Sequence, residues 1–168
     1  MKIAPFVCAV LASLTIHAQG AMQGPPRQES SDQHAAGVDM RGDHAMGFSH
    51  EDTKHHFELL PDGGVIEVDA KRKSDMATRD QIREHLKHIA GMFNANDFEI
   101  PMFIHDRVPP GVPMMKQKRG EITYTYAPTP RGGMVRIVTH DSEALKAVHE
   151  FLAFQIKDHR TGDPVGGK

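Results

Sequence analysis

The sequence predicts an α+β domain in which a four-stranded antiparallel sheet carries two helices on one face. Two kinds of pattern lead to this prediction. Two strand–turn–strand patterns each contain a Gly-Gly pair in the turn, where the backbone needs a positive φ. Each is followed by a stretch whose apolar residues recur with helical spacing. We therefore expect two ββα units that form a degenerate internal repeat.

The first unit is expected to pair strands at 56–60 and 65–70 through a Pro-Asp-Gly-Gly turn at 61–64. Ser74 or Thr78 can then cap the N-terminus of a helix. The apolar residues of this helix are Ile82, Leu86, Ile89 and Phe93. Their spacing of i, i+4, i+7 and i+11 places them on one face, which we expect to cover the sheet.

The second unit repeats this order, with strands at 122–126 and 134–139 and a turn at 127–133. The apolar face of its helix consists of Leu145, Val148, Leu152 and Ile156. Alignment of the two helical faces gives His149 the place of Leu86, on the buried side. A buried histidine is usually neutral and structural. The alternatives are a metal ligand and a titratable group under the long connection between the units.

That connection, residues 94–120, contains four prolines and many apolar residues. Connections of this length tend to be functional or disordered. Because this one is apolar, we expect an ordered Pro-rich loop that packs along the domain, with a short strand at 102–104. The single α+β domain would then span residues 53–160, followed by a flexible Gly-rich tail at 161–168.

Residues 1–20 have the form of a secretory signal peptide. Lys2 precedes an apolar run at 3–16, and small residues follow. At about 14 residues this run is shorter than the ~20 that a spanning helix needs. We therefore expect cleavage, no stable membrane insertion and a periplasmic or secreted location. The only cysteine, Cys8, lies in this segment, so the mature chain would contain none.

Residues 21–52 are rich in Gly, Pro, Gln, Ser, Asp, His and Met and contain few bulky apolar residues. Such a composition buries too little surface to offset its ordering entropy. We expect a disordered arm that carries several donor side chains, among them His44, Met46 and His50.

The chain contains 12 His and 10 Met but a single Cys. Imidazole and thioether are ligands for soft or borderline transition metals, and above all for copper. The sequence therefore predicts an exported protein that binds a transition metal, with copper as the first choice. The candidate ligands are His85, His88 and Met92 on one helix flank, Met102, His105, Met114 and Met115 in the long loop, and, more weakly, His44, Met46 and His50 in the arm.

Each group of candidates also has a purely structural interpretation. Histidines three residues apart can be solvated flank residues, and methionines often fill gaps in a core. In the loop, Asp106 follows His105, and a carboxylate can orient an imidazole for metal binding or for general-base work. Adjacent residues rarely orient each other in this way.

A binding or interaction module of the cell envelope without metal, with a cleft under the 94–120 loop, is the alternative function. An enzyme is less favoured, because the sequence lacks a zinc-binding His-Glu-x-x-His helix, a phosphate loop and a nucleophile elbow. The net charge of −2 and the absence of a long basic block argue against nucleic acid as a partner. A metal ion or a small ligand is expected instead. The open face of the sheet is either solvated or a homodimer interface.

The stretches DFEIPMFIHDRVPPGVP at 97–113 and AVHEFLAFQIKDHRTGD at 147–163 resemble a group of small, uncharacterised exported bacterial proteins. The resemblance covers roughly the whole folded part. It implies an exported single-domain protein, and it implies no activity and no site.

Overall fold

The computed structural model describes residues 30–166. The predicted signal peptide, residues 1–20, lies outside the described residues, as do 21–29 and 167–168. The elements in chain order are α1 (Ser31–Met46), η1 (His50–Asp52), β1 (Thr53–Leu60), β2 (Gly63–Ala70), α2 (Met76–Asn94), α3 (Glu99–His105), α4 (Val112–Gln117), β3 (Ile122–Pro128), β4 (Gly132–Thr139) and α5 (Ser142–Asp158). Within residues 30–166, no helix combines the length and apolar character needed to cross a membrane.

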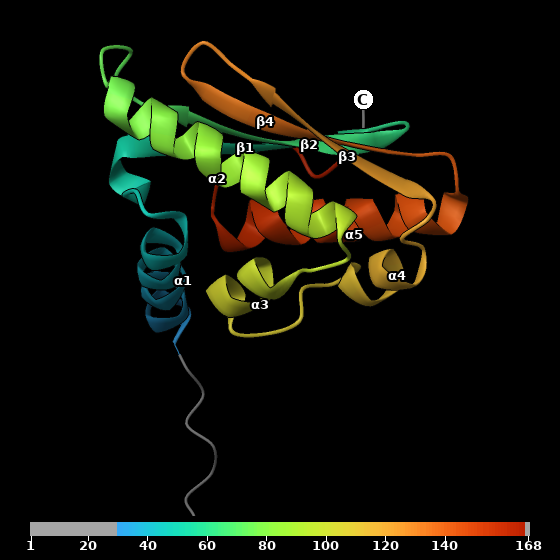
Figure 1. Ribbon diagram of the computed structural model, residues 1–168. Helices are drawn as coiled ribbons and strands as arrows, with labels where there is room; N and C mark the ends of the chain where they lie inside the picture. The colour runs from blue at the N-terminus through green and yellow to red at the C-terminus, as the bar shows by residue number, and fades with distance from the viewer. Residues whose placement is uncertain (1–29, 167–168) are drawn as a thin grey trace, which may run out of the picture.

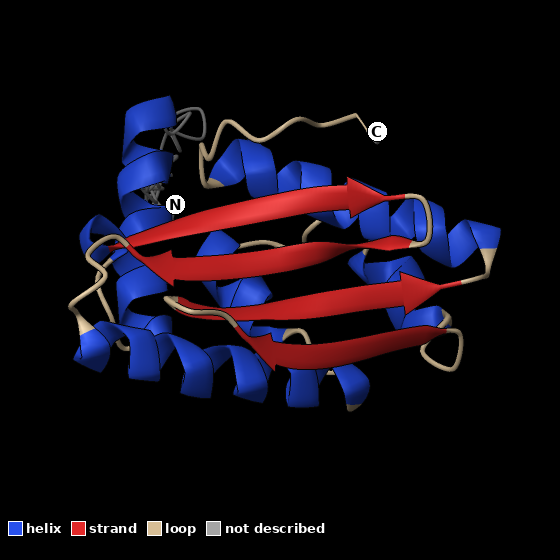
Figure 2. Cartoon of the chain, turned by 90° about the horizontal axis from the view of Figure 1, so that it is seen from above, coloured by secondary structure: helices blue, strands red, loops and turns tan. Residues whose placement is uncertain are grey.

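The predicted fold is confirmed. The four strands form one antiparallel sheet in the order β1-β2-β4-β3. Helices α2 and α5 lie side by side beneath it (Figure 1), and the view from above shows the opposite face without a helix over it (Figure 2). Helix α2 packs mainly against β3 and β4, whereas α5 packs mainly against β1 and β2. Each helix therefore covers the hairpin of the other unit.

The core lies between the sheet and these two helices. Alternate strand residues point toward the helices and are buried, namely Phe57, Leu59, Ile66, Val68, Ile122, Tyr124, Val135 and Ile137. The predicted apolar face of α2, from Ile82 to Phe93, is buried against them. Each such side chain contributes about 1.5–3 kcal/mol when it leaves water. This interface is consequently the main stabilising feature of the domain.

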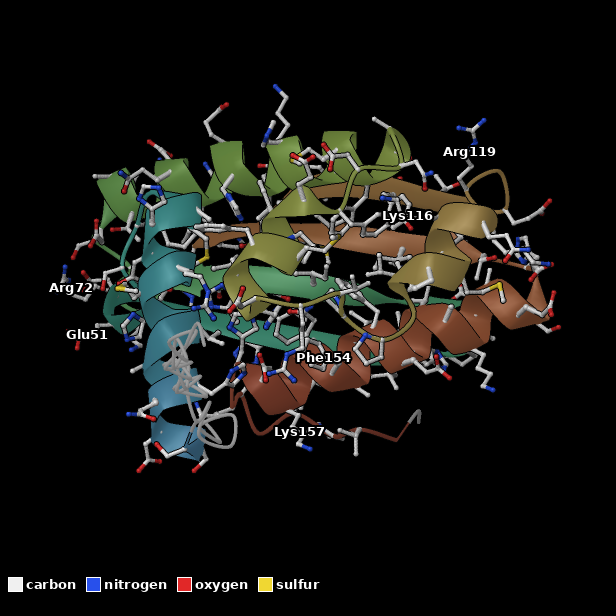
Figure 3. The ribbon with its side chains drawn as sticks, turned by 90° about the horizontal axis from the view of Figure 1, so that it is seen from below. Glu51, Arg72, Lys116, Arg119, Phe154 and Lys157 are labelled. Carbon is white, nitrogen blue, oxygen red and sulfur yellow. The ribbon has the colours of Figure 1, made fainter. Side chains whose placement is uncertain are left out.

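Two short helices form a third layer, because α3 and α4 lie between α2 and α5 on the side away from the sheet (Figure 3). The connection 94–120 is thus largely helical, and the strand expected at 102–104 is wrong. Pro101 lies in the first turn of α3, where a missing N–H is tolerated. Ile104 and Val112 are buried, so both helices are held by the apolar residues noted in the sequence.

The segment expected to be a disordered arm, 21–52, contains helix α1 instead. Ser30 caps this helix, and Gln33 completes a capping box. Gly47 ends it with a φ of 77°. Val38 and Met46 are buried on one stripe. Two apolar residues on one stripe are enough to dock a capped helix onto an existing domain, and composition alone does not reveal such a stripe.

The two units form an internal repeat, but the residue offset between corresponding strands differs from the offset between the corresponding helices. Strands β3 and β4 begin 69 residues after β1 and β2, and α5 begins 66 residues after α2. The helical alignment expected from the apolar pattern is therefore three residues out of register. Leu152 is the true counterpart of Leu86. A Cβ atom on Gly64 would meet Leu152, and one on the corresponding Gly133 would meet Leu86.

With this register, His149 corresponds to Arg83, and both side chains hold the turn of a hairpin. Arg83 Nε donates to the carbonyl of Gly132 at 3.0 Å. His149 Nε2 donates to the carbonyl of Gly63 at 3.1 Å, and Gly63 corresponds to Gly132. His149 is half-buried on the flank of α5, so the alignment that buried it in place of Leu86 is wrong.

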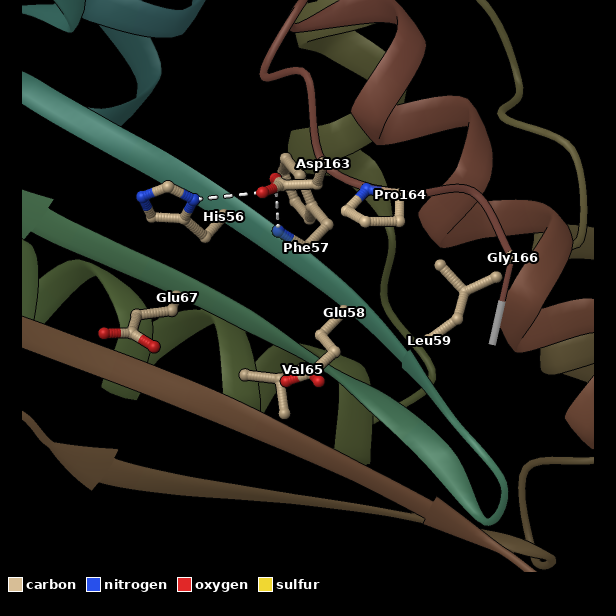
Figure 4. Close-up of a pocket in the computed structure, with 9 residues that line it drawn as sticks. All are labelled: His56, Phe57, Glu58, Leu59, Val65, Glu67, Asp163, Pro164 and Gly166. Atoms are coloured by element: carbon tan, nitrogen blue, oxygen red, sulfur yellow. Dashed lines mark hydrogen bonds and ion pairs between the residues drawn. The ribbon is translucent and has the colours of Figure 1, made fainter. Parts of the chain in front are cut away.

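The described part of the C-terminal tail, 161–166, follows the edge strand β1 (Figure 4). Asp163 accepts hydrogen bonds from the backbone N–H of Phe57 at 3.0 Å and from His56 Nδ1 at 3.1 Å. Glu58 and Glu67 help to line a shallow cavity of about 270 Å³ beside it. The tail thus occupies free backbone groups of the sheet edge, whereas the sequence predicts only a flexible end.

Candidate functional site

Four histidines from four different elements line one cavity of about 60 Å³, hereafter the imidazole cavity. They are His55 of β1, His85 of α2, His105 of α3 and His159, which caps the C-terminus of α5. The thioether of Met46 also reaches it from the last residue of α1. Apart from Gln155, its other lining residues are apolar. Soft and borderline donor groups thus meet in an otherwise apolar setting.

His159 lies at the centre of the ring contacts. It stacks on His55 with centroids 5.4 Å apart and planes 3° apart. It meets His105 edge to face, with centroids 5.0 Å apart. Phe57 packs within 6.4 Å of both His55 and His159, measured between ring centroids. His55, His105 and His159 are therefore held as members of one aromatic cluster, whereas His85 meets Phe48 edge to face with centroids 5.7 Å apart.

Burial keeps these imidazoles uncharged at neutral pH. Together with smaller contributions from neighbouring histidines, it lowers the pKa of His55 and of His85 from 6.5 to about 4. Burial, with smaller contributions from His55 and His105, also places the pKa of His159 well below its usual value. A neutral imidazole keeps a lone pair on one nitrogen, which is the form that binds metals.

A buried carboxylate orients the fourth imidazole. His105 is 1% exposed, and its Nδ1 donates to Asp158 at 2.5 Å. Burial lowers the pKa of His105, although hydrogen bonds to Asp158 and Gln155 oppose this effect. Partial burial opposes ionisation of Asp158, but hydrogen bonds from His105 and His34 outweigh it and leave the pKa of Asp158 below its usual value. The His105 ring is consequently fixed in orientation.

Gln155 faces the other nitrogen of this ring. Its Oε1 lies 2.9 Å from His105 Nε2, while its own Nε2 is buried without a hydrogen-bond partner among the described residues. A half-turn of the amide would let Nε2 donate to the lone pair of the neutral ring. His105 Nε2 is thus the ring nitrogen that Asp158 does not hold.

The internal repeat shows what replaces these imidazoles in the other unit. With shifts of 69 for strands and 66 for helices, the counterparts of His55, His85 and His159 are Tyr124, Phe151 and Phe93. Phe93 contacts both other rings, with centroids 5.4 Å from Tyr124 and 6.1 Å from Phe151. One of the two repeat-related clusters therefore consists of aromatic rings and the other of imidazoles. Tyr124, Phe151 and Phe93 are buried, whereas the three imidazoles are partly buried, so the exchange places polar rings with lone pairs beside the cavity.

The predicted ligands of the domain separate into two places. His85 and His105 do reach one cavity, although they come from the two different predicted groups. His88 and Met92 instead line a shallow depression on the outer side of α2. The three methionines of the long connection pack against the hydrophobic core, with Met115 fully buried and Met102 and Met114 partly buried.

The predicted ligands of the arm also separate. Met46 lines the imidazole cavity, as described above. His44 is exposed beside Phe103, with ring centroids 6.1 Å apart. His50 Nδ1 donates to Asp43 at 2.9 Å, outside the imidazole cavity.

Two residues of the cluster were not among the predicted ligands. They are His55 and His159. Their signal in the sequence is the repeat itself, since both align with aromatic residues once the strands are shifted by 69 and the helices by 66. The apolar pattern alone gives the helix register three residues wrong and hides this signal.

A second cavity, hereafter the vestibule, has a volume of about 310 Å³. It shares Met46, His55 and His159 with the imidazole cavity. Its outer lining includes the exposed side chains of Lys54 and Arg160. The vestibule therefore joins the imidazole cluster to the surface.

Among residues 30–166, no three His, Cys, Asp or Glu side chains are arranged to hold a metal ion as the rings now stand. No family model, no curated protein and no solved structure matches this chain.

Proposed function

We propose that this is an exported protein that binds one transition metal ion, with copper as the first choice, at the imidazole cavity. The observation that supports the proposal is that His55, His85 and His159 occupy positions whose repeat counterparts are aromatic rings, Tyr124, Phe151 and Phe93. Neutral imidazoles with free lone pairs in an apolar surrounding are suited to coordinate a metal ion, since few water molecules compete for the nitrogens.

The size of the cavity favours an ion over an organic ligand. About 60 Å³ corresponds to roughly two water molecules. Pockets for small molecules usually measure about 300–1,000 Å³. A binding module without metal, the alternative function, would have to use a different cavity. The residues of α3 that line the imidazole cavity, such as Ile104, leave too little room beneath this segment for an organic ligand.

The donor set favours copper. Three imidazoles with the Met46 thioether combine a borderline and a soft ligand type, which suits both Cu(II) and Cu(I). His105 would act as a further ligand through Nε2, with Asp158 holding its Nδ1. A carboxylate on the far nitrogen is the usual way in which proteins orient a metal-binding histidine.

Binding requires a limited movement of the rings. Two imidazoles on one ion, at a nitrogen–metal distance of about 2 Å, hold their centroids roughly 5 Å apart. His159 already lies 5.0 Å from His105 and 5.4 Å from His55. Because the His55 and His159 planes are nearly parallel, the two rings must rotate out of their stack before both can direct a lone pair at one ion.

The test compares two triple variants with the wild-type chain. The first, His55→Tyr/His85→Phe/His159→Phe, installs the aromatic rings of the three repeat counterparts. The matched control, His44→Gln/His88→Gln/His140→Gln, removes three exposed histidines, two of which are ligands predicted from the sequence. Affinities for Cu(I), Cu(II) and Zn(II) are measured against competing chelators.

We expect the control to bind like the wild type and the aromatic variant to lose more than about 100-fold, since even outer-shell changes cost 10- to 100-fold. Circular dichroism would establish that both variants fold. Wild-type affinity no greater than that of an unfolded His-rich peptide would refute the proposal. Equal losses in the two variants would also refute it.

A further inference from the structure

We infer that the vestibule is a binding site for a small oxyanion, a carboxylate or a phosphate. At about 310 Å³ it is large enough for a small molecule, which the imidazole cavity is not. It lies between α1, β1 and the end of α5, so that three separate parts of the chain build its walls.

The charges around the vestibule favour an anion. Lys54, Lys71 and Arg160 line it, whereas Asp39 is its only lining carboxylate among the described residues. Arg160 Nη2 contacts both carboxylate oxygens of Asp39 at 2.6 Å, so this pair is neutral as a whole. The two ammonium groups are left without a carboxylate in the lining. Cationic donors of this kind make strong, charge-assisted hydrogen bonds to oxyanions.

One of the two ammonium groups is already held in place. Lys71 Nζ donates to the backbone carbonyl of Glu51 at 2.5 Å, which fixes it beside the short helix η1. Two of the other lining groups can donate as well, because neutral His55 and His159 each carry one N–H, whereas the N–H of His50 is taken by Asp43. An anion in the vestibule would thus find donors at its rim and along its inner wall.

The shared wall couples the two cavities. His55 and His159 belong to both, so an anion that contacts these rings changes the position of two proposed metal ligands. Such coupling is reciprocal: if the anion raises metal affinity, the metal raises anion affinity by the same factor. This step rests on the proposed function, whereas anion binding to the metal-free protein does not.

The first experiment uses the full chain without metal. Inorganic phosphate and succinate are titrated at constant ionic strength, and NMR follows the backbone amides of 53–56 and 159–161. We expect saturable shifts that weaken by roughly tenfold in Lys54→Gln/Lys71→Gln, since a charged hydrogen bond contributes about 1.5–3 kcal/mol. The control, Lys87→Gln/Lys116→Gln, removes two exposed charges elsewhere and should bind normally. Tighter binding of phosphate or of succinate identifies the anion class.

Linear, non-saturating shifts, or equal weakening in the two double variants, would overturn the inference. The second experiment measures Zn(II) affinity with and without a saturating amount of the better anion. An unchanged affinity would overturn the coupling and leave the proposed function intact. Saturable anion binding by a chain that binds no metal would overturn the proposed function and leave the vestibule site intact.

Discussion

His55 and His159 stack with their ring planes 3° apart, although one lies in strand β1 and the other follows the last turn of helix α5. Their repeat counterparts, Tyr124 of β3 and Phe93 of α2, also contact each other, but edge to face at 5.4 Å. Both pairs of repeat-related positions thus support a ring contact between a strand and the end of a helix. What distinguishes the first pair is that its rings are imidazoles.

Replacement of His159 by Phe should raise the free energy of unfolding by about 1 kcal/mol at pH 7, because a more apolar ring is buried at the same place. The adjoining cavity of about 60 Å³ has room for the larger side chain. Urea unfolding of His159→Phe measures the effect, with the exposed His140→Phe as a control. A destabilised His159→Phe would mean that the imidazole is needed for packing.

Stability should fall as the pH drops from 6.5 toward 4. Burial holds the pKa of His55 and of His85 at about 4 in the folded chain, compared with 6.5 when exposed. In this window the unfolded chain takes up protons that the native state does not, so each residue costs about 1–3 kcal/mol by pH 4. Well above pH 6.5 these histidines are neutral in both the folded and the unfolded chain, so the loss of stability disappears. Urea unfolding at pH 7 and at pH 4.5 measures it.

Protonation of Asp and Glu side chains also changes the stability at low pH. The same measurement on His55→Tyr/His85→Phe/His159→Phe separates the contribution of the three imidazoles from that of these carboxylates. That variant should show a clearly flatter pH dependence between 4 and 6.5 than the wild type. Identical slopes would show that the three imidazoles already titrate normally in the native state.

The sheet and its two helices could be predicted because their signals are local. The Gly-Gly turns at 63–64 and 132–133 and the face from Ile82 to Phe93 need no knowledge of distant residues. The helical register of the second unit could not be predicted in this way. Leu145 fits the apolar spacing of α5 but is only half-buried, whereas Phe151 is fully buried. An alignment based on periodicity alone therefore shifted the helix by three residues and hid the counterparts of the imidazole cluster.

The remaining errors concern segments that fold only against the rest of the domain. Helix α1 buries only Val38 and Met46 as apolar side chains and is also held by polar contacts such as His34–Asp158, which composition does not reveal. In the long connection, the apolar residues indicated packing correctly but not its helical form. The candidate site is assembled from residues of four elements that are far apart in the sequence. The sequence could therefore indicate that histidines are potential ligands, but not which of them share one cavity.

Removal of either hairpin-holding side chain should destabilise the domain by about 1 kcal/mol, because turn carbonyls lose a buried donor. The variants are His149→Ala and Arg83→Ala, which act on corresponding turns. Neither should alter metal affinity, since neither residue lines the imidazole cavity. Urea unfolding and the chelator competition check both statements. A loss of metal binding in His149→Ala, with normal binding in Arg83→Ala, would indicate that His149 is a ligand.

Asp158→Asn should cost about 1–3 kcal/mol of stability, because the carboxylate accepts from His105 at 2.5 Å and from His34 at 3.0 Å. Metal affinity should fall about 10- to 100-fold, as expected when the group that orients a ligand is lost. Asp106→Asn, at an exposed position, is the control. A variant that loses stability but keeps full metal affinity would remove His105 from the ligand set.

Met46→Leu should weaken Cu(I) binding about tenfold and leave Zn(II) binding unchanged, because only Cu(I) gains much from a thioether. Folding stability should change by less than about 1.5 kcal/mol, since the exchange conserves volume and apolar character. Met115 of α4 provides a control, because it is also buried but does not line the imidazole cavity. Met115→Leu removes a buried sulfur elsewhere in the domain and should leave both affinities unchanged. Chelator competition with the two metals separates the cases: equal effects of the two substitutions would exclude Met46 as a ligand, whereas a Cu(I)-specific loss in Met46→Leu alone would assign the thioether to the site.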